Sequence, residues 1–220
     1  MWAWALDEPF SAVDQMNGQS LYRLLADMLR DLAIPIVLVT HDLHEARLLA
    51  DRFVVMDAGR VLQQGSPDAI HRAPRNARVA DLVGIHNRFE GVWLGPAAEP
   101  GWGLLRWESD AVAGAALPML LKVRDKGRLS TGQSVHWILP GDGVTVLDQA
   151  PQATGEFGVE VTEARHLGEI TLATLALTGV PGAVLRLTLS GAQRTPVVVG
   201  AALTVRLDLD LVHVMPVRAS

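Results

Sequence analysis

Two adjacent carboxylates and one distant histidine are the residues of this chain whose types and spacing could do chemistry. Asp7 and Glu8 follow an apolar run over residues 2–6, and His41 follows a second apolar run over residues 34–39. An apolar run that ends in acid is typical of a buried parallel strand, which delivers its last side chains to the sheet edge where ligands bind. There the first acid could hold Mg²⁺ and the second could orient or deprotonate an attacking water, as phosphoryl transfer requires.

The nine-residue string from Leu6 to Asp14, LDEPFSAVD, is more informative than its Asp-Glu pair alone. An isolated pair is more often a solvated strand end, but a second strand that ends near His41, about one strand–helix–strand unit later, favours a catalytic site. The string resembles the Walker B strand and D-loop of the ABC transporter ATPases, and His41 resembles their switch histidine. The chain is therefore similar to part of an ABC transporter ATPase subunit.

The resemblance assigns a role to each of these side chains. Asp7 would reach Mg²⁺, in part through water, and Glu8 would be the general base or the residue that orients the water. His41 would contact the γ-phosphate across the site. Ser11 and Asp14 would line the contact with the nucleotide and the opposite ATPase subunit of a homodimer. These roles suit the chemistry, because phosphoryl transfer needs charge neutralisation and water placement more than a covalent nucleophile.

Part of a complete nucleotide site is missing from the sequence. No phosphate cradle of the form G-x-x-x-x-G-K-[ST] occurs, and no LSGGQ-like signature precedes Asp7. We therefore expect the chain to begin inside a domain, through truncation or a mis-set start; a signal peptide is a poor alternative because a basic segment and a long apolar core are lacking. We predict that this chain alone neither binds ATP tightly nor hydrolyses it, whereas the full-length protein would be an ABC-type ATPase that uses ATP and Mg²⁺.

Composition narrows the class of protein. The chain has 220 residues, 49% of them hydrophobic, which is enough for one large or two small domains, and no apolar run is long enough to span a bilayer. The net charge of −5 argues against a broad nucleic-acid footprint, so nucleic acid is not an expected partner. Cysteine is absent from the sequence, which excludes disulfides and thiolate metal sites.

Residues 1–85 alternate between strand and helix patterns, as the closing third of an ABC ATPase domain does. Apolar residues recur at helical spacing over 17–32, and residues 34–39 form the short apolar run of a buried parallel strand. Ser66 is a candidate N-cap, with Pro67 at the first helical position. The pattern predicts, in order, a helix over 17–32, a strand over 34–39, a helix over 42–50, a hairpin over 53–62 and a short helix after Ser66.

From residue 86 onward the helical periodicity fades, and short β-rich runs alternate with Gly, Pro and Asp. Several runs alternate apolar and polar residues, which is typical of sheets with one solvated face, and their close spacing predicts a small barrel or sandwich. Two series form a weak repeat of roughly 65 residues in which Gly132 aligns with Gly200. This part resembles the TOBE region of importer ATPases, with one or two OB-like barrels; any small β domain is the alternative.

The predicted fold class is thus α/β, the C-terminal part of a P-loop ABC ATPase domain, followed by an all-β OB-like barrel region. The predicted domains are 1–85, a partial ATPase domain, and 86–220, a TOBE-like regulatory region. Residues 86–150 and 151–220 are its two candidate halves, with a linker over 148–152 between them.

Other residues could bind a ligand in the β region, although a structural role is the commoner explanation for each. The turn Ser130-Thr131-Gly132-Gln133-Ser134 could offer hydroxyls and backbone N–H groups to an oxyanion, and Arg165, Thr171 and Thr174 could do likewise. Apart from His41 and His44, which would supply only two ligands, the histidines show no metal-ligand spacing with a supporting carboxylate, so we do not expect a metal site built from them. Core packing or a partner contact explains the six tryptophans more simply than base stacking.

The resemblance implies a cytoplasmic protein, peripheral on the inner face of the cell membrane, that powers uptake of a small solute through transmembrane permease subunits. The junction Asn87-Arg88-Phe89-Glu90-Gly91 looks most like the molybdate, sulfate and ferric-iron branch, which implies an oxyanion or metal ion as solute. Polyamine and sugar branches are near alternatives. The rival interpretation is a non-catalytic β module that binds a small oxyanion, and a decayed gene product is a third.

Overall fold

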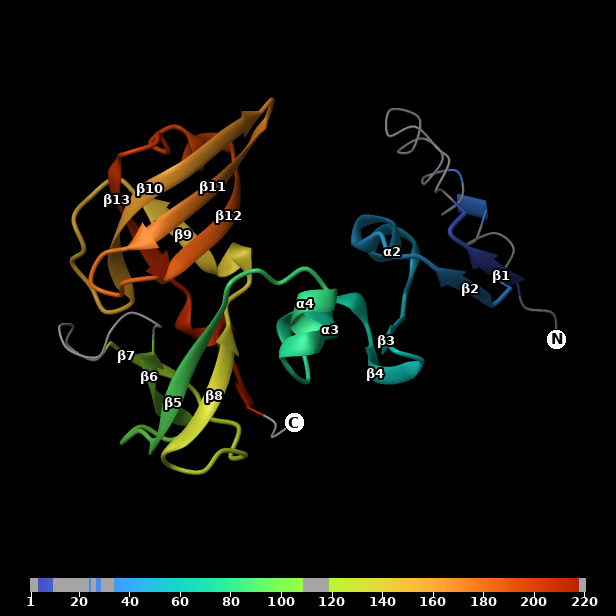
Figure 1. The fold of residues 1–220 in the computed structure, drawn as a ribbon, viewed down its shortest axis with the longest axis horizontal. Helices are drawn as coiled ribbons and strands as arrows, with labels where there is room; N and C mark the ends of the chain where they lie inside the picture. Colours follow the sequence, from blue (N-terminus) through green and yellow to red (C-terminus); the bar gives the residue numbers. More distant parts are fainter. Residues whose placement is uncertain (1–3, 10–23, 25–26, 29–33, 109–118, 218–220) are drawn as a thin grey trace. The chain divides into compact units, whose positions relative to one another are not determined.

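The computed structural model describes residues 4–9, 24, 27–28, 34–108 and 119–217 (Figure 1). The chain divides into two compact units, the first ending at His71 and the second beginning at Arg72. The domain limits at 85/86 and 150/151 remain predictions from the sequence. Most of the regular secondary structure is β-structure, and within the described residues the α/β character rests on one parallel strand pair and the helix that follows it.

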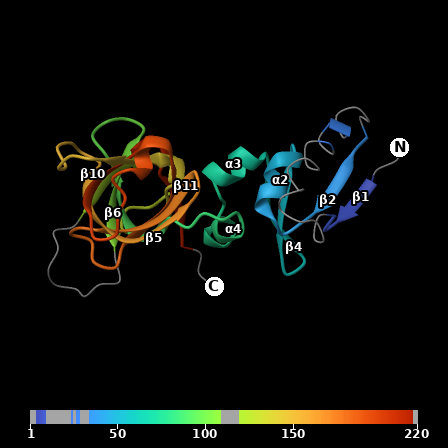
Figure 2. The same cartoon turned by 90° about the horizontal axis from the view of Figure 1, so that it is seen from above.

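The first unit contains the two strands that the catalytic interpretation requires. Strand β1 (Trp4–Asp7) pairs in parallel with strand β2 (Ile36–Val39), and Asp7 lies opposite Val39 (Figure 2). Helix α2 (Leu43–Leu49) follows β2, so the predicted strand over 34–39 and helix over 42–50 are confirmed. The predicted helix over 17–32 lies almost wholly outside the described residues.

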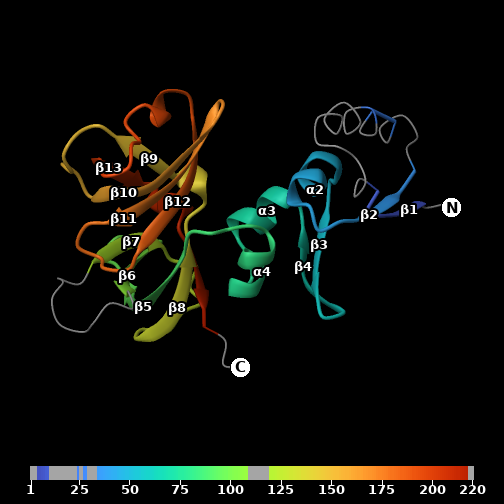
Figure 3. The same ribbon diagram turned by 45° about the horizontal axis from the view of Figure 1, so that its top comes forward.

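A hairpin and a capped helix complete the first unit. Strands β3 (Phe53–Asp57) and β4 (Arg60–Gly65) pair in antiparallel fashion, as predicted, and Figure 3 shows this hairpin separate from β1 and β2. Helix α3 (Pro67–Arg72) begins where expected. Ser66 is its N-cap, because the Ser66 hydroxyl accepts a hydrogen bond from the Ala69 N–H at 3.2 Å.

The second unit begins with helix α4 and continues as strands. Helix α4 (Ala77–Leu82) was not expected from the sequence; its N-cap is Asn76, whose side chain accepts a hydrogen bond from the Val79 N–H at 2.9 Å. The strands that follow agree with the predicted β-rich runs. They are β5 (Arg88–Pro96), β6 (Trp102–Glu108), β7 (Leu120–Arg124), β8 (Gln133–Ile138), β9 (Val144–Leu147), β10 (Glu156–Leu167), β11 (Ile170–Leu177), β12 (Val184–Ser190), β13 (Ala202–Leu207) and β14 (His213–Pro216).

The strands form two five-stranded sheets that exchange their closing strands. One sheet has the order β14-β8-β5-β6-β7, and the other has the order β9-β13-β10-β11-β12 when read in the matching direction. Strand β9 therefore leaves its own series to pair with β13, and β14 returns to pair with β8. The two halves of the repeat thus have the same strand order but are interlocked.

Equivalent glycine turns mark the repeat. Gly132 and Gly200 both have left-handed backbone, with φ of 82° and 84°, and both precede the fourth strand of their series. The Gly132 N–H donates to the Trp93 carbonyl at 2.7 Å, and the Gly200 N–H donates to the Val161 carbonyl at 2.8 Å. The alignment of the two glycines in the sequence is therefore reproduced in the backbone hydrogen bonding.

A single apolar core joins the two sheets, with buried side chains from both, including Leu105 and Trp137 from one and Leu175 and Val205 from the other. Within it the Trp107 and Trp137 rings meet edge to face with centroids 4.6 Å apart, which is a favourable aromatic geometry. The Trp137 indole N–H donates to the Glu90 carbonyl at 3.2 Å. The expectation that tryptophans serve core packing is confirmed for these rings.

Candidate functional site

The parallel pairing of β1 and β2 places the predicted catalytic residues at one sheet edge. Because Asp7 lies opposite Val39, the chain leaves both strands on the same side, toward Glu8 and His41. The Glu8 N–H donates to the Val39 carbonyl at 2.8 Å and so extends the ladder by one bond. Glu8 also has a φ of 45°, a left-handed conformation that non-glycine residues seldom adopt and that concentrates at functional sites.

Glu8 and His41, 33 residues apart in sequence, meet at this edge. Oxygen Oε1 of Glu8 lies 2.7 Å from the His41 ring nitrogen Nδ1 and accepts a second hydrogen bond, at 3.1 Å, from the His41 backbone N–H. The His41 side chain is 86% exposed and that of Glu8 36%. One carboxylate oxygen thus holds the histidine by ring and backbone together, while the rest of the ring faces solvent.

The contact changes the protonation of the histidine. The hydrogen bond from Glu8, followed by its negative charge, raises the pKa of His41 above its usual value, and the charges of Asp42 and Glu45 add to this while desolvation opposes it. Because the pKa is raised on folding, the pair stabilises the fold fully below pH 6.5 and ceases to do so as the pH rises through the folded-state pKa. Protonated His41 would present a cation beside an acid, and a cation of this kind can contact a phosphate oxygen.

Asp7 is exposed at the end of β1, where a single carboxylate could bind Mg²⁺ together with water and phosphate. Magnesium commonly takes only one or two protein carboxylates, so this donor fits an ion that a nucleotide also holds. Within the described ranges, no three His, Asp or Glu side chains gather closely enough to hold a metal by themselves. Ser11 and Asp14, the other predicted nucleotide residues, lie outside the described residues.

Three backbone N–H groups of the turn over residues 130–134, those of Ser130, Gly132 and Gln133, donate hydrogen bonds within the protein. Besides the Gly132 N–H, the Gln133 N–H donates to the Ser130 carbonyl at 3.1 Å, and the Ser130 N–H donates to Gln133 Oε1 at 3.0 Å. Thr171 is fully buried, and its hydroxyl lies 2.9 Å from His166 Nδ1 and 3.3 Å from Arg194 Nε. These hydrogen bonds support the local structure, and binding of an oxyanion by these residues stays a prediction.

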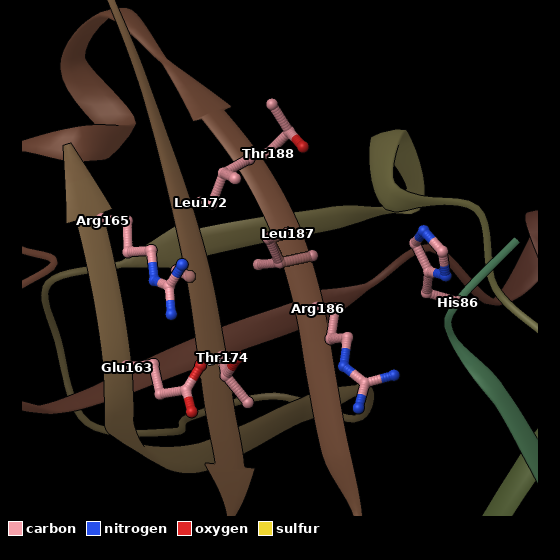
Figure 4. A pocket seen from close by; sticks show the side chains of 9 residues that line it. His86, Glu163, Arg165, Leu172, Thr174, Arg186, Leu187 and Thr188 are labelled. Carbon is pink, nitrogen blue, oxygen red and sulfur yellow. Dashed lines mark hydrogen bonds between the residues drawn. The ribbon is translucent and has the colours of Figure 1, made fainter. Parts of the chain in front are cut away.

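Arg165 and Thr174 lie instead on the outer face of the second sheet, in an open pocket of about 350 Å³ (Figure 4). Arg186 projects from β12 on the same face, and neither arginine guanidinium makes an ion pair with a described residue. Glu163 lies below Arg165 and beside Thr174 in Figure 4, and it accepts a long hydrogen bond, 3.4 Å, from Thr174. Arg165 and Thr174 could be named as candidates from the sequence; Glu163 and Arg186 were missed, although the alternation of outward positions along their strands is a signal that includes them.

Comparison with known proteins identifies relatives of the chain, although no family model matches it. A sulfate/thiosulfate import ATP-binding protein of Chromobacterium violaceum is 33% identical over 217 residues, which is 98% of this chain and 55% of that protein. A spermidine/putrescine import ATP-binding protein of Borreliella afzelii is 42% identical over 88 residues, 40% of this chain and 25% of that protein. A sulfate/thiosulfate import ATP-binding protein of Caulobacter vibrioides is 44% identical over 86 residues, 39% of this chain and 25% of that protein.

The chain is similar to ATP-binding subunits of ABC importers. It corresponds to the C-terminal part of such subunits and spans about half the length, 55%, of the Chromobacterium relative. Among solved structures, the molybdate-bound cytoplasmic molybdate-binding protein matches with a TM-score of 0.48 and 14% identity, covering 61% of this chain and 98% of that one. A likeness this weak supports no conclusion about ligand or fold. In the part of the chain that the structure describes, no helix is long and apolar enough to cross a membrane.

Proposed function

We propose that this chain supplies the Walker B, D-loop and switch-histidine portion of the ATPase site of an ABC importer, followed by a β regulatory region of the TOBE type. One observation carries the proposal: Glu8 Oε1 holds both the ring and the backbone N–H of His41 at the edge where Asp7 ends β1. The names of the relatives, which are import ATP-binding proteins, support the same activity.

In the proposed site each side chain has one task. MgATP, when bound, supplies the phosphoryl group and an ion that neutralises its charge. Asp7 holds the ion, Glu8 orients or deprotonates the attacking water, and His41 contacts the γ-phosphate. The contact between Glu8 and His41 keeps the base and the cation together on one side of the site. Ser11 and Asp14 would face the nucleotide and the second subunit of a homodimer.

The partners of the whole protein follow from the importer activity. Transmembrane permease subunits would carry the solute, and the ATPase would sit on the inner face of the cell membrane. The relatives named for sulfate and thiosulfate favour an oxyanion as the solute, and the relative named for polyamines keeps a small organic cation as the alternative.

A chimaera tests the activity. The part of the Chromobacterium violaceum relative that this chain does not match would be joined to this chain, and Mg²⁺-dependent ATP hydrolysis would be compared with that of the 220-residue chain alone. We expect turnover in the chimaera and none in the chain alone, because the chain lacks the phosphate cradle. Turnover by the chain alone, or none by a folded, ATP-binding chimaera, would contradict the proposal.

The pocket on the outer face of β10, β11 and β12 favours a second candidate, an oxyanion-binding regulatory module. Two guanidinium groups without an ion-pair partner among the described residues, Arg165 and Arg186, are suited to an anion. Calorimetry of the chain with molybdate, tungstate and sulfate would detect such binding. Binding that is lost in Arg165→Gln and Arg186→Gln but kept in Arg106→Gln, whose arginine pairs with Glu108, would support this candidate. Equal loss in all three variants would reject it.

A further inference from the structure

The connection between β2 and α2 is held by a ring of hydrogen bonds through a buried carboxylate. The Thr40 hydroxyl donates to Glu45 Oε2 at 2.8 Å and accepts from the Asp42 N–H at 3.0 Å. Asp42 Oδ1 in turn accepts from the Glu45 N–H at 3.3 Å. Glu45 is only 6% exposed, so its carboxylate is the interior anchor of this ring.

The ring is an extended form of a helix capping box. In the usual box the residue before the helix caps the N–H three residues on, and the acid there reaches back to the capping residue's N–H. Here Asp42 caps Glu45, but the Glu45 carboxylate reaches the Asp42 N–H through the Thr40 hydroxyl. The box therefore includes one residue more than helix capping requires, and that residue precedes His41.

His41 lies between the two residues that the ring fixes. The His41 side chain is 86% exposed, so packing against neighbouring side chains cannot set the direction of the imidazole. Its contacts with Glu8 involve both the backbone N–H and the ring nitrogen, and these two donors meet one oxygen only if the backbone has a defined conformation. The fixed positions of Thr40 and Asp42 supply that conformation.

We propose that Thr40 and Glu45 are positioning residues for His41, and that the hydroxyl–carboxylate bond between them holds the His41 backbone so that its N–H and ring both reach Glu8. The importance of this role for catalysis rests on the proposed function, but the positioning itself is a property of the chain. In the proposed site, neither residue contacts the reacting groups.

The test separates geometry from charge. The carboxylates of Glu8, Asp42 and Glu45 all act on His41, so removal of any one of these acids would change the pKa of the imidazole through charge alone. Thr40→Val keeps the shape and every charge while it removes the hydroxyl, and Thr40→Ser restores the hydroxyl. Glu45→Gln is a second variant, which keeps an acceptor oxygen and removes the charge.

The measurement is ¹⁵N and ¹H NMR of His41 in the 220-residue chain, without nucleotide. In the parent, neutral His41 should carry its proton on Nδ1, toward Glu8, and its backbone N–H should exchange slowly. In Thr40→Val we expect loss of the Nδ1–H preference, faster exchange of the His41 N–H and a titration midpoint shifted toward 6.5; Thr40→Ser should restore all three. Glu45→Gln should weaken them, and spectra of α2 would show that the variants remain folded.

Parent-like tautomer and exchange in folded Thr40→Val would overturn the proposal, as would their loss in Thr40→Ser. Absence of the Nδ1–H signature in the parent would also overturn it, because there would be no contact to position. These outcomes are independent of ATP hydrolysis by the chimaera, so failure of the positioning and failure of the proposed function can be told apart.

Discussion

The contact between Glu8 and His41 joins two residues that follow different strands and are 33 positions apart. Both residues could be named from the sequence, because the string LDEPFSAVD and the Thr-His-Asp step resemble family motifs. The supporting residues Thr40 and Glu45 could not be named from the sequence, because the hydrogen bond between them depends on how α2 turns after β2. The type and position of Glu8 and His41 in the sequence thus indicated their chemistry, whereas the hydrogen bonds that hold His41 in place could be identified only from the three-dimensional structure.

His213 offers a second test on a single residue, because its pKa is shifted in the direction opposite to that of His41. Its Nε2–H donates to the Pro74 carbonyl at 3.0 Å, and its Nδ1 accepts from Lys126 at 2.8 Å. Burial, followed by the charge of Lys126, lowers the pKa of His213 to about 4, with Arg128 adding to the effect. Because the pKa is lowered on folding, this histidine destabilises the fold as the pH falls from 6.5 through about 4.

We predict that His213→Gln, which cannot titrate, removes this part of the acid sensitivity. The shift corresponds to about 3 kcal/mol of unfolding free energy between pH 7 and pH 4. Urea unfolding of parent and variant over this pH range measures the change in unfolding free energy. Because the other titrating groups are the same in both proteins, their contribution cancels in the difference. Identical pH dependence in the two proteins would show that His213 is not held in its neutral form.

Among the secondary-structure elements, the strands were predicted well from the alternation of apolar and polar residues and from the Gly, Pro and Asp residues between the runs. The β-rich runs after residue 86 correspond to β5 through β13, because alternating residues separated by Gly, Pro and Asp leave few other structures open. Helix α4 was missed, since its six residues are too few to show a helical period, although Asn76 three residues before Val79 was an available capping signal. Short elements held by one cap and by tertiary packing are the part that periodicity misses.

A glycine in β6 provides an element-level test. A methyl group at Gly103 would overlap the indole ring of Trp93, which is 1% exposed in the core. We predict that Gly103→Ala costs roughly 1–3 kcal/mol, because the ring or the strand must move in a packed interior. Gly141→Ala is the matched control, since nothing lies within 4 Å of a methyl there. Thermal unfolding of both variants measures the effect; equal losses would contradict the packing argument.

At the scale of the whole molecule, the repeat is interlocked rather than modular. The sequence indicated two similar series but could not show that β9 and β14 change partners, because strand pairing is non-local and both arrangements satisfy the same apolar pattern. The exchange ties each half to the core of the other. Residues 86–150 and 151–220 are therefore expected to fold together.

This interlocking predicts one unfolding transition for the two sheets. The indole N–H signals of Trp93 and Trp137 report on the first sheet, and backbone signals of Leu175 and Leu185 report on the second. In a urea titration followed by NMR, all four should share one midpoint, because their side chains belong to one core. Two well-separated midpoints would show that the halves are independent despite the exchanged strands.

The proposed role of Glu8 in ATP hydrolysis is tested by the nucleotide that the chimaera retains when it carries Glu8→Gln. If Glu8 orients or deprotonates the attacking water, this variant should bind ATP with Mg²⁺, keep it unhydrolysed and turn over roughly 100-fold more slowly or less. Retention of ATP at parent-like affinity with that loss of turnover is the predicted result. Turnover equal to that of the unsubstituted chimaera, with ADP released, would remove Glu8 from its assigned role.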